Sequence, residues 1–184
     1  MEIMLKNVRL GPFAELFRAK EFKVGDGKPR WSAALVIDAG SENDKFIRNA
    51  IEAEAKNVHG DKAVKWLASI AGQKNQYCYL DGASKGESFE GKWVLSTHRS
   101  AKLARPLIID RDKSPLTADD AKPYPGCFVN AKVEIYAQKG ENAGMRASFS
   151  VIQFAADGEA FGSFTPSADG FDDITAGADA DSLV

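Results

Sequence analysis

The feature that most constrains the fold is a strict alternation of side chains over residues 127–138. Its odd-numbered positions are apolar: Cys127, Val129, Ala131, Val133 and Ile135. Successive side chains of a strand point to opposite faces, so this period of two predicts a strand with one face in a core. A second strand is expected at residues 146–154, and the glycine-containing segment 140–144 between them suits a hairpin turn. The chain should therefore contain an antiparallel sheet with one buried face.

Shorter strand-like runs precede this hairpin, at residues 3–10, 30–37, 77–80, 92–99 and 105–111. Between the second and third of them the periodicity becomes helical. Ser41 is expected to cap a helix with Asp44 as its capping-box partner, and the helix should bury one face: Phe46, Ile47, Ala50, Ile51 and Ala55. A second, short helix is expected from Asp61 to about Gly72, with three buried residues: Val64, Leu67 and Ile70. Residues 117–122 should form a helical turn.

Short strands interrupted by a helical insertion and closed by a hairpin predict a mainly β fold, an OB-type Greek-key barrel. The composition, 44% hydrophobic and 10% aromatic, is sufficient for a true core over residues 1–162. From residue 163 the composition shifts to Ala, Asp, Gly, Ser and Thr. Such a segment cannot bury enough apolar surface to offset its ordering entropy, so residues 163–184 are predicted to be a disordered tail.

The net charge of −2 conceals an uneven distribution along the chain. The last basic residue is Arg146, and seven of the 26 acidic residues follow it. The first 146 residues therefore contain 24 basic and 19 acidic residues, an excess of about five positive charges. A basic body with an acidic end is found among nucleic-acid-binding proteins with interaction tails, although acidic tails also serve solubility alone.

Neither cysteine usage nor hydropathy points to export or membrane insertion. Cys78 and Cys127 lie in apolar strand-like runs without zinc-type spacing, which favours buried, reduced thiols. The first residues, MEIMLK, are too polar for a signal peptide, and no run is apolar for long enough to cross a bilayer. We expect a soluble protein of the cytoplasm.

The even-numbered face of residues 127–138 is the leading candidate for a binding surface, because it carries Phe128, Asn130, Lys132 and Tyr136. Flat rings on which bases stack, beside cations that contact phosphates, are what a single-strand-binding surface requires. The alternative is that Phe128 and Tyr136 pack beneath a loop or the helices.

Further aromatic and basic residues are candidates for the same role: Tyr77, Tyr79, Lys92, Trp93, Arg99, Lys102 and Arg105. No acidic residue lies between Lys92 and Asp110 to neutralise the cations of that segment. Trp93 shares its strand face with Leu95 and Thr97, so it could equally belong to the core. Lone strand cations such as Arg9 and Arg30 are expected to be solvated.

Catalytic motifs are sparse. The two histidines, His59 and His98, have no second metal-type ligand at a recognisable spacing, and no phosphate-binding loop is present. We therefore expect no enzyme activity, metal or cofactor. The alternative is a Mg²⁺-dependent nuclease that uses Asp110 and Asp112.

Three segments resemble a known family: residues 104–110 (ARPLIID), residues 124–131 (YPGCFVNA), and residues 151–154 (VIQF) with the following 157–162 (DGEAFG). They are similar to single-stranded DNA-binding proteins of tailed bacteriophages, which have an OB fold with a helical insertion. The resemblance covers most of residues 1–162 and is strongest from Arg105 onward.

The resemblance implies a protein that coats single-stranded DNA during phage replication and recombination in the cytoplasm of the infected bacterium, without sequence preference or cofactor. It also implies that phage replication proteins bind an acidic tail, here represented by Asp169, Phe171, Asp172, Asp173, Asp179 and Asp181. The terminal aromatic residue common in such tails is missing. A homodimer is a further expectation. The alternatives to a DNA-coating protein are a structural or protein-interaction module of phage and a strand-annealing recombinase.

Overall fold

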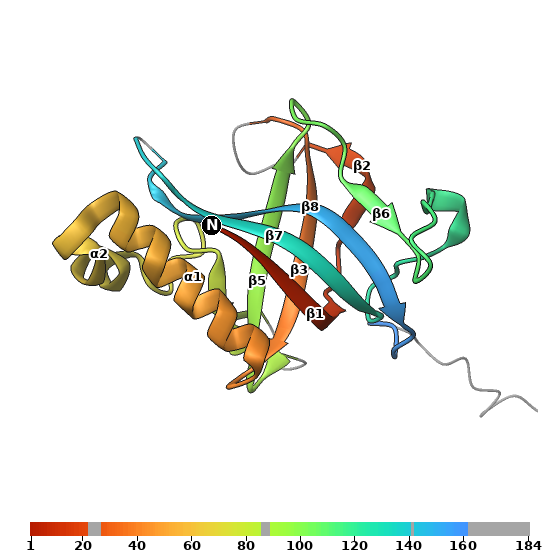
Figure 1. The fold of residues 1–184 in the computed structure, drawn as a ribbon, viewed down its shortest axis with the longest axis horizontal. Coiled ribbons are helices and arrows are strands. Elements are labelled where there is room, and N and C mark those ends of the chain that lie inside the picture. The colour runs from red at the N-terminus through yellow and green to blue at the C-terminus, as the bar shows by residue number, and fades with distance from the viewer. Residues whose placement is uncertain (22–26, 86–88, 141, 162–184) are drawn as a thin grey trace, which may run out of the picture.

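Five long strands form the centre of the computed structural model, which describes residues 1–21, 27–85, 89–140 and 142–161 (Figure 1). They are β1 (Glu2–Leu10), β3 (Arg30–Asp38), β5 (Lys92–Ser100), β7 (Phe128–Gln138) and β8 (Gly144–Ala156). These strands pair antiparallel in the order β5-β3-β1-β7-β8. The predicted hairpin is confirmed as β7 and β8; β7 begins one residue later than predicted, and β8 is four residues longer than predicted.

Three short strands complete the sheet: β2 (Glu15–Lys20), β4 (Tyr79–Asp81) and β6 (Leu107–Ile109). β4 pairs with β5, and β6 runs parallel to β8 at the other flank. β2 pairs with β3 beyond the end of β1 and was not predicted, because its sequence ELFRAK has no regular apolar alternation.

The sheet curls until its two flanks meet. Met145 of β8 donates its backbone N–H to the carbonyl of Gln76 at 2.8 Å, and Ser96 of β5 donates to the carbonyl of Cys78 at 2.8 Å. The line along which the two flanks meet is here called the seam. The segment just before β4 joins β5 to β8 at one end of it. This curled sheet of five long strands is the OB-type barrel that the sequence predicts.

The helical insertion lies between β3 and β4 and consists of α1 (Glu42–His59), the 3₁₀ turn η1 (Gly60–Lys62) and α2 (Ala63–Ile70). Figure 1 shows α1 lying alongside the barrel, with α2 folded back at its far end. Four of the five residues predicted to face the core from α1 do so: Ile47, Ala50, Ile51 and Ala55. Phe46 is 45% exposed, so its assignment to this face was wrong.

The predicted face of α2 was also wrong in part. Val64 is 80% exposed, and the buried residues are Ala63 and Ile70, seven positions apart on one side of the helix. In a helix of only eight residues, the packing against α1 decides which side is buried. The predicted helical turn after Pro115 is confirmed as η4 (Ala118–Asp120).

The barrel interior is filled by the faces that alternation predicts. The odd-numbered residues of β7 and the residue before it, from Cys127 to Ile135, have no exposed surface. Two large rings from β8, Phe149 and Phe154, are likewise fully buried. Among the described residues, no helix is both long enough and apolar enough to cross a membrane. The predicted disordered tail, residues 163–184, lies outside the described residues.

Candidate nucleic-acid interface

The side of the sheet that turns away from the core is here called the outward face. Strand register places it at the even-numbered positions of β3 and β5, where Val36 is opposite Val94, Ala34 opposite Ser96 and Ser32 opposite His98. On β7 it carries Phe128, Asn130, Lys132 and Tyr136. All four are partly exposed, so neither ring is sealed in the interior, and the Phe128 ring also lies close to the loop at Gly158.

A groove of about 210 Å³ lies on the outward face where β1, β3 and β7 meet. Arg9 of β1 is directly opposite Phe128 of β7 and Val36 of β3, so these three side chains are neighbours. Lys92 and Phe161 line the same groove. Two aromatic rings and two cations are therefore brought together from four separate segments.

Arg9 is held in place by the chain that crosses the barrel after β8. Its Nε donates to the carbonyl of Gly126 at 3.2 Å, and its Nη2 donates to the carbonyl of Glu159 at 2.6 Å. Its guanidinium lies 4.2 Å from the centroid of the Phe161 ring, a cation–π distance. Neither partner carbonyl neutralises the charge, so the groove keeps a fixed positive centre.

Residues 157–161 form a strap across the outward face. The ring of Phe161 lies 5.3 Å from that of Phe89 and covers the apolar pair Val36 and Val94. A Cβ at Gly158 would lie 2.3 Å from the carbonyl oxygen of Gly126, so this close crossing requires glycine. The acidic segment of the sequence thus begins at the groove.

The middle of β7 is occupied by polar contacts. Asn130 accepts a hydrogen bond from the Asn7 backbone N–H at 2.9 Å and donates to Gln153 at 3.0 Å. Lys132 forms a 2.9 Å ion pair with the exposed carboxylate of Glu2. Both predicted residues lie on the outward face, each with a partner within the protein.

Tyr136, near the far end of β7, is opposite Arg146 of β8. Desolvation by burial raises the pKa of the Tyr136 hydroxyl, while the charges of Arg146 and Arg30 act in the opposite direction. Two guanidinium groups therefore lie near this half-buried ring.

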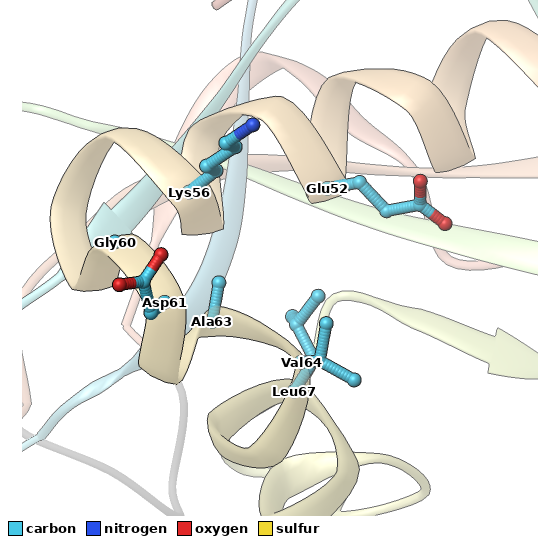
Figure 2. A pocket seen from close by; sticks show the side chains of 7 residues that line it. All are labelled: Glu52, Lys56, Gly60, Asp61, Ala63, Val64 and Leu67. Carbon is cyan, nitrogen blue, oxygen red and sulfur yellow. The ribbon is translucent and has the colours of Figure 1, made fainter.

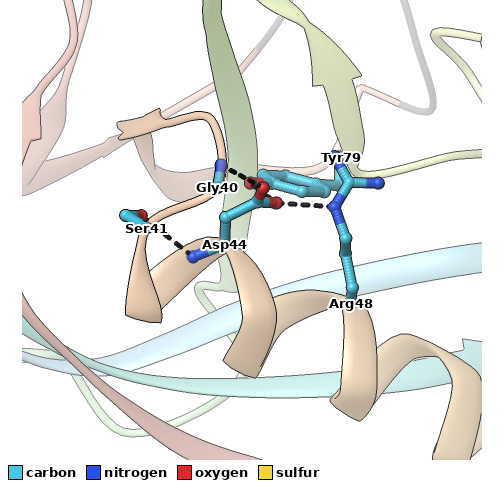
Figure 3. A network of polar contacts seen from close by, with 5 residues as sticks. All are labelled: Gly40, Ser41, Asp44, Arg48 and Tyr79. Carbon is cyan, nitrogen blue, oxygen red and sulfur yellow. Dashed lines mark hydrogen bonds and ion pairs between the residues drawn. The ribbon is translucent and has the colours of Figure 1, made fainter.

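The structure corrects the prediction that Tyr79 and Trp93 belong to the binding surface. Tyr79 is 1% exposed, and its hydroxyl donates a 2.8 Å hydrogen bond to the carboxylate of Asp44, so it cannot stack on a base (Figure 3). Trp93 is half-buried, with its ring 5.3 Å from that of Tyr79 and 4.3 Å from the guanidinium of Arg48. Strand alternation places both on the core side of the sheet, beneath α1.

Asp44 is the centre of this polar cluster at the start of α1 (Figure 3). It accepts hydrogen bonds from Gly40 N–H at 2.8 Å and from Arg48 Nε at 2.7 Å, in addition to that from Tyr79. Burial alone would raise the pKa of this carboxyl, but the three hydrogen bonds outweigh it and hold the pKa below its ordinary value. Ser41 caps α1 as predicted, whereas Asp44 bonds to Gly40 instead of the Ser41 N–H.

The remaining residues predicted to contact DNA do not lie together in the structure. Tyr77 is half-buried beside Met145 at the closed end of the seam, where burial raises its pKa to about 12. Arg99 donates to the carbonyls of Ala104 at 2.6 Å and Phe149 at 3.5 Å, so its guanidinium joins β5 to β8. Lys92 pairs with Asp38 at the rim of the groove.

Lys102 and Arg105 are exposed in the connection between β5 and β6, away from the groove residues. Asp110 and Asp112 bond to nearby groups of their own loop, Asp110 to Arg111 N–H and Asp112 to Ser114. Within the described part of the chain, no three potential metal ligands gather into a cluster.

A larger groove, of about 480 Å³, lies between α1 and α2 (Figure 2). Val64 and Leu67 of α2 face Lys56 and Glu52 of α1 across it, and Asp61 closes one end. Two acids and one cation give it no positive excess, so it does not suit a phosphate backbone.

Arg9 and Phe161 are the groove residues that inspection of the sequence missed. A lone strand cation such as Arg9 is expected to be solvated, and Phe161 is followed by a tail-like composition. The signal that was present is the glycine pair Gly126 and Gly158, which marks a close backbone crossing and lies within the motifs that carry the family resemblance.

Comparison with known proteins gives one consistent result. The family model described as Enterobacter phage Enc34, ssDNA-binding protein, matches residues 1–183. Protein p50 of Acyrthosiphon pisum secondary endosymbiont phage 1 is 39% identical in an alignment of 182 residues that covers 95% of this chain and 95% of the other.

Solved structures agree with the fold. The single-stranded DNA-binding protein of bacteriophage Enc34 in complex with ssDNA superposes with a TM-score of 0.70 at 23% identity, over 88% of this chain and 89% of the other. The single-stranded DNA-binding protein gp2.5 of bacteriophage T7 gives 0.59 at 11% identity, over 90% and 97% of the two chains. At these identities the structures support the fold alone.

Proposed function

Because the chain belongs to the family of the single-stranded DNA-binding protein of Enterobacter phage Enc34, we propose that it binds unpaired DNA during phage replication. Binding is independent of sequence, since every base has a flat face that can stack on an aromatic ring. The proteins of this family bind DNA and are not enzymes, so the nuclease alternative for Asp110 and Asp112 is set aside.

The observation that supports this function is the groove on the outward face. Phe128 and Phe161 supply rings, and Arg9 supplies positive charge, within one hollow of the surface; Lys92 also lines it, paired there with Asp38. Phe128 and Tyr136 lie on the same side of β7, so one strand of DNA can contact both. Lys132 lies between them, where a phosphate would compete with Glu2 for its ammonium group.

Salt titration tests the electrostatic part of this proposal. Each phosphate neutralised on a single strand contributes about −0.7 to the slope of log K against log salt, so about three contacts predict a slope near −2. We expect a labelled oligo-dT to bind at 50 mM salt and to weaken steeply by 200 mM, as measured by fluorescence anisotropy. A duplex of equal length should bind more weakly. If oligo-dT is not bound even at low ionic strength, the proposed function is wrong.

Deletion of residues 163–184 should tighten binding at low salt. This segment contains five aspartates and no cation, and it follows the strap that places Phe161 in the groove. An acidic segment tethered there competes with phosphates for the same cations. The truncated and full-length chains should converge as salt is raised, because screening weakens the competitor. Equal affinities at 20 mM salt would rule out competition by the tail.

Other parts of the expected function stay predictions. They are recruitment of phage replication proteins by Asp169, Phe171 and the other tail acids, a role in recombination, a homodimer, and action in the cytoplasm of the infected bacterium. Complementary-strand annealing assays separate a binding protein from an annealing recombinase, and a protein-interaction module would ignore oligo-dT altogether.

A further inference from the structure

Phe13 occupies an unfavourable position for a residue with only a structural role. It lies in the turn between β1 and β2, its side chain is 90% exposed, and its backbone has a φ of 62°. A left-handed conformation is sterically costly for a residue with a Cβ, and a phenyl ring in water gains nothing from burial. The fold therefore displays an aromatic ring at the surface in spite of both costs, and this makes Phe13 a candidate for a ligand contact.

The turn that carries Phe13 begins at Gly11, which continues the pairing of β1 with β3. Gly11 donates its N–H to the carbonyl of Ala34 at 2.7 Å, and a Cβ at Gly11 would lie 3.0 Å from the Cβ of Ala34. Ala34 is in turn opposite Ser96 of β5. Gly11, Ala34 and Ser96 thus form a floor of small residues across three neighbouring segments, in which Gly11 is buried and Ala34 and Ser96 are partly exposed.

Positive charge flanks this floor on both sides. Arg9, with its guanidinium in the groove, precedes Gly11 by two residues. On the other side are Arg18 and Lys20 of β2 and Arg30 of β3, which is opposite Lys20. Glu15 is the acid within β2, and it is paired with Lys20. The arrangement combines an exposed ring, a floor without bulky side chains and an excess of cations.

We propose that Phe13 is a base-stacking residue: it holds one unpaired base of a single strand beside the Gly11–Ala34–Ser96 floor. The strand thereby continues from the Arg9 groove toward β2. This assignment rests on the proposed function and extends its site to a turn that carries none of the residues predicted from the sequence. Stacking accepts any base, so the contact adds affinity without sequence preference.

The test compares Phe13→Ala, Phe13→Leu and Phe13→Trp in the full-length chain. Loss of one stacked base should weaken oligo-dT binding about tenfold in the Ala variant, and nearly as much in the Leu variant, which keeps apolar volume without a flat ring. The Trp variant should retain affinity. Its emission, taken as the difference from the wild-type chain with three tryptophans, should be quenched by DNA.

Matched controls separate stacking from other effects. Phe46→Ala removes an exposed ring from α1 and should leave affinity unchanged. The slope of log K against log salt should be unaltered in Phe13→Ala but reduced in Arg9→Gln, because only the latter removes a charge. All Phe13 variants should keep the wild-type thermal midpoint, since the ring packs on little.

The outcomes distinguish the two proposals. If the wild-type chain binds oligo-dT and Phe13→Ala binds it equally well, the stacking role of Phe13 is overturned while DNA binding stands. If the wild-type chain does not bind, the proposed function fails, and the Phe13 assignment fails with it. A change of oligomeric state in Phe13→Ala with unaltered DNA affinity would assign the ring to a protein contact and overturn stacking.

Discussion

Phe128→Ala should weaken the binding of a single-stranded oligonucleotide about tenfold, and the double variant with Tyr136→Ala about a hundredfold. A base stacked on an aromatic side chain contributes about 1–3 kcal/mol, and 1.4 kcal/mol corresponds to a factor of ten. The two rings are eight residues apart on β7, or about 27 Å at the rise of a strand, so they contact different bases. Their effects should therefore add. Fluorescence anisotropy at a fixed salt concentration measures both variants.

Phe128→Leu is the informative control for this experiment. Leucine keeps apolar contact with the strap at Gly158 but offers no flat ring, so its stability should be close to wild type while its affinity falls. Phe46→Ala on α1 should change neither. If Phe128→Ala lowers the thermal midpoint and leaves affinity intact, the ring only packs the strap, and the stacking role is wrong.

Asp44→Ala should lower the free energy of unfolding by about 3 kcal/mol. The change removes hydrogen bonds to a charged carboxylate, each contributing about 1.5–3 kcal/mol, and leaves the buried hydroxyl of Tyr79 without its acceptor. The ion pair with Arg48 adds little, because that side chain is 41% exposed and its charge is screened. Urea denaturation at pH 7 measures the difference.

The double variant Asp44→Ala with Tyr79→Phe tests the cause of that loss. Removing the orphaned hydroxyl should make the double variant at least as stable as Asp44→Ala alone. If Asp44→Ala is as stable as the wild type, the cluster at the start of α1 does not anchor the helix. DNA affinity should change little in folded Asp44→Ala, because the side chains of Asp44 on α1 and Tyr79 on β4 are buried against each other and not on the outward face.

The same carboxylate predicts a dependence of stability on pH. The pKa of Asp44 in the folded protein lies below its ordinary value of 3.8. The contribution is therefore fully present above pH 3.8 and is lost as the pH falls through the folded pKa. The difference in unfolding free energy between the wild type and Asp44→Ala should be constant from pH 7 to about pH 5 and shrink below pH 3.8.

Site residues were predicted correctly where the pattern of one strand was sufficient, and wrongly where a distant segment covers the strand. The face of β7 was predictable, because alternation over one strand separates Phe128 and Tyr136 from the buried valines without any knowledge of the partners. The stacking roles given to Tyr79 and Trp93 were wrong. Tyr79 lies in β4, which at three residues is too short for alternation to show which side is covered. Trp93 lies on the longer β5, where alternation left a core position open. In both cases α1, more than thirty residues earlier in the chain, supplies the cover.

Local pattern in the sequence was enough to determine a mainly β chain, the helical insertion, the terminal hairpin and the uneven charge, because each depends on residues that are near neighbours along the chain. Only the tertiary structure decided that Arg9 lies beside Phe128 and beneath Phe161, through contacts between residues more than a hundred positions apart. Register between distant strands and the crossing at Gly126 and Gly158 are set by the packing of the whole barrel. A groove built from several strands therefore has no signature in any one of them.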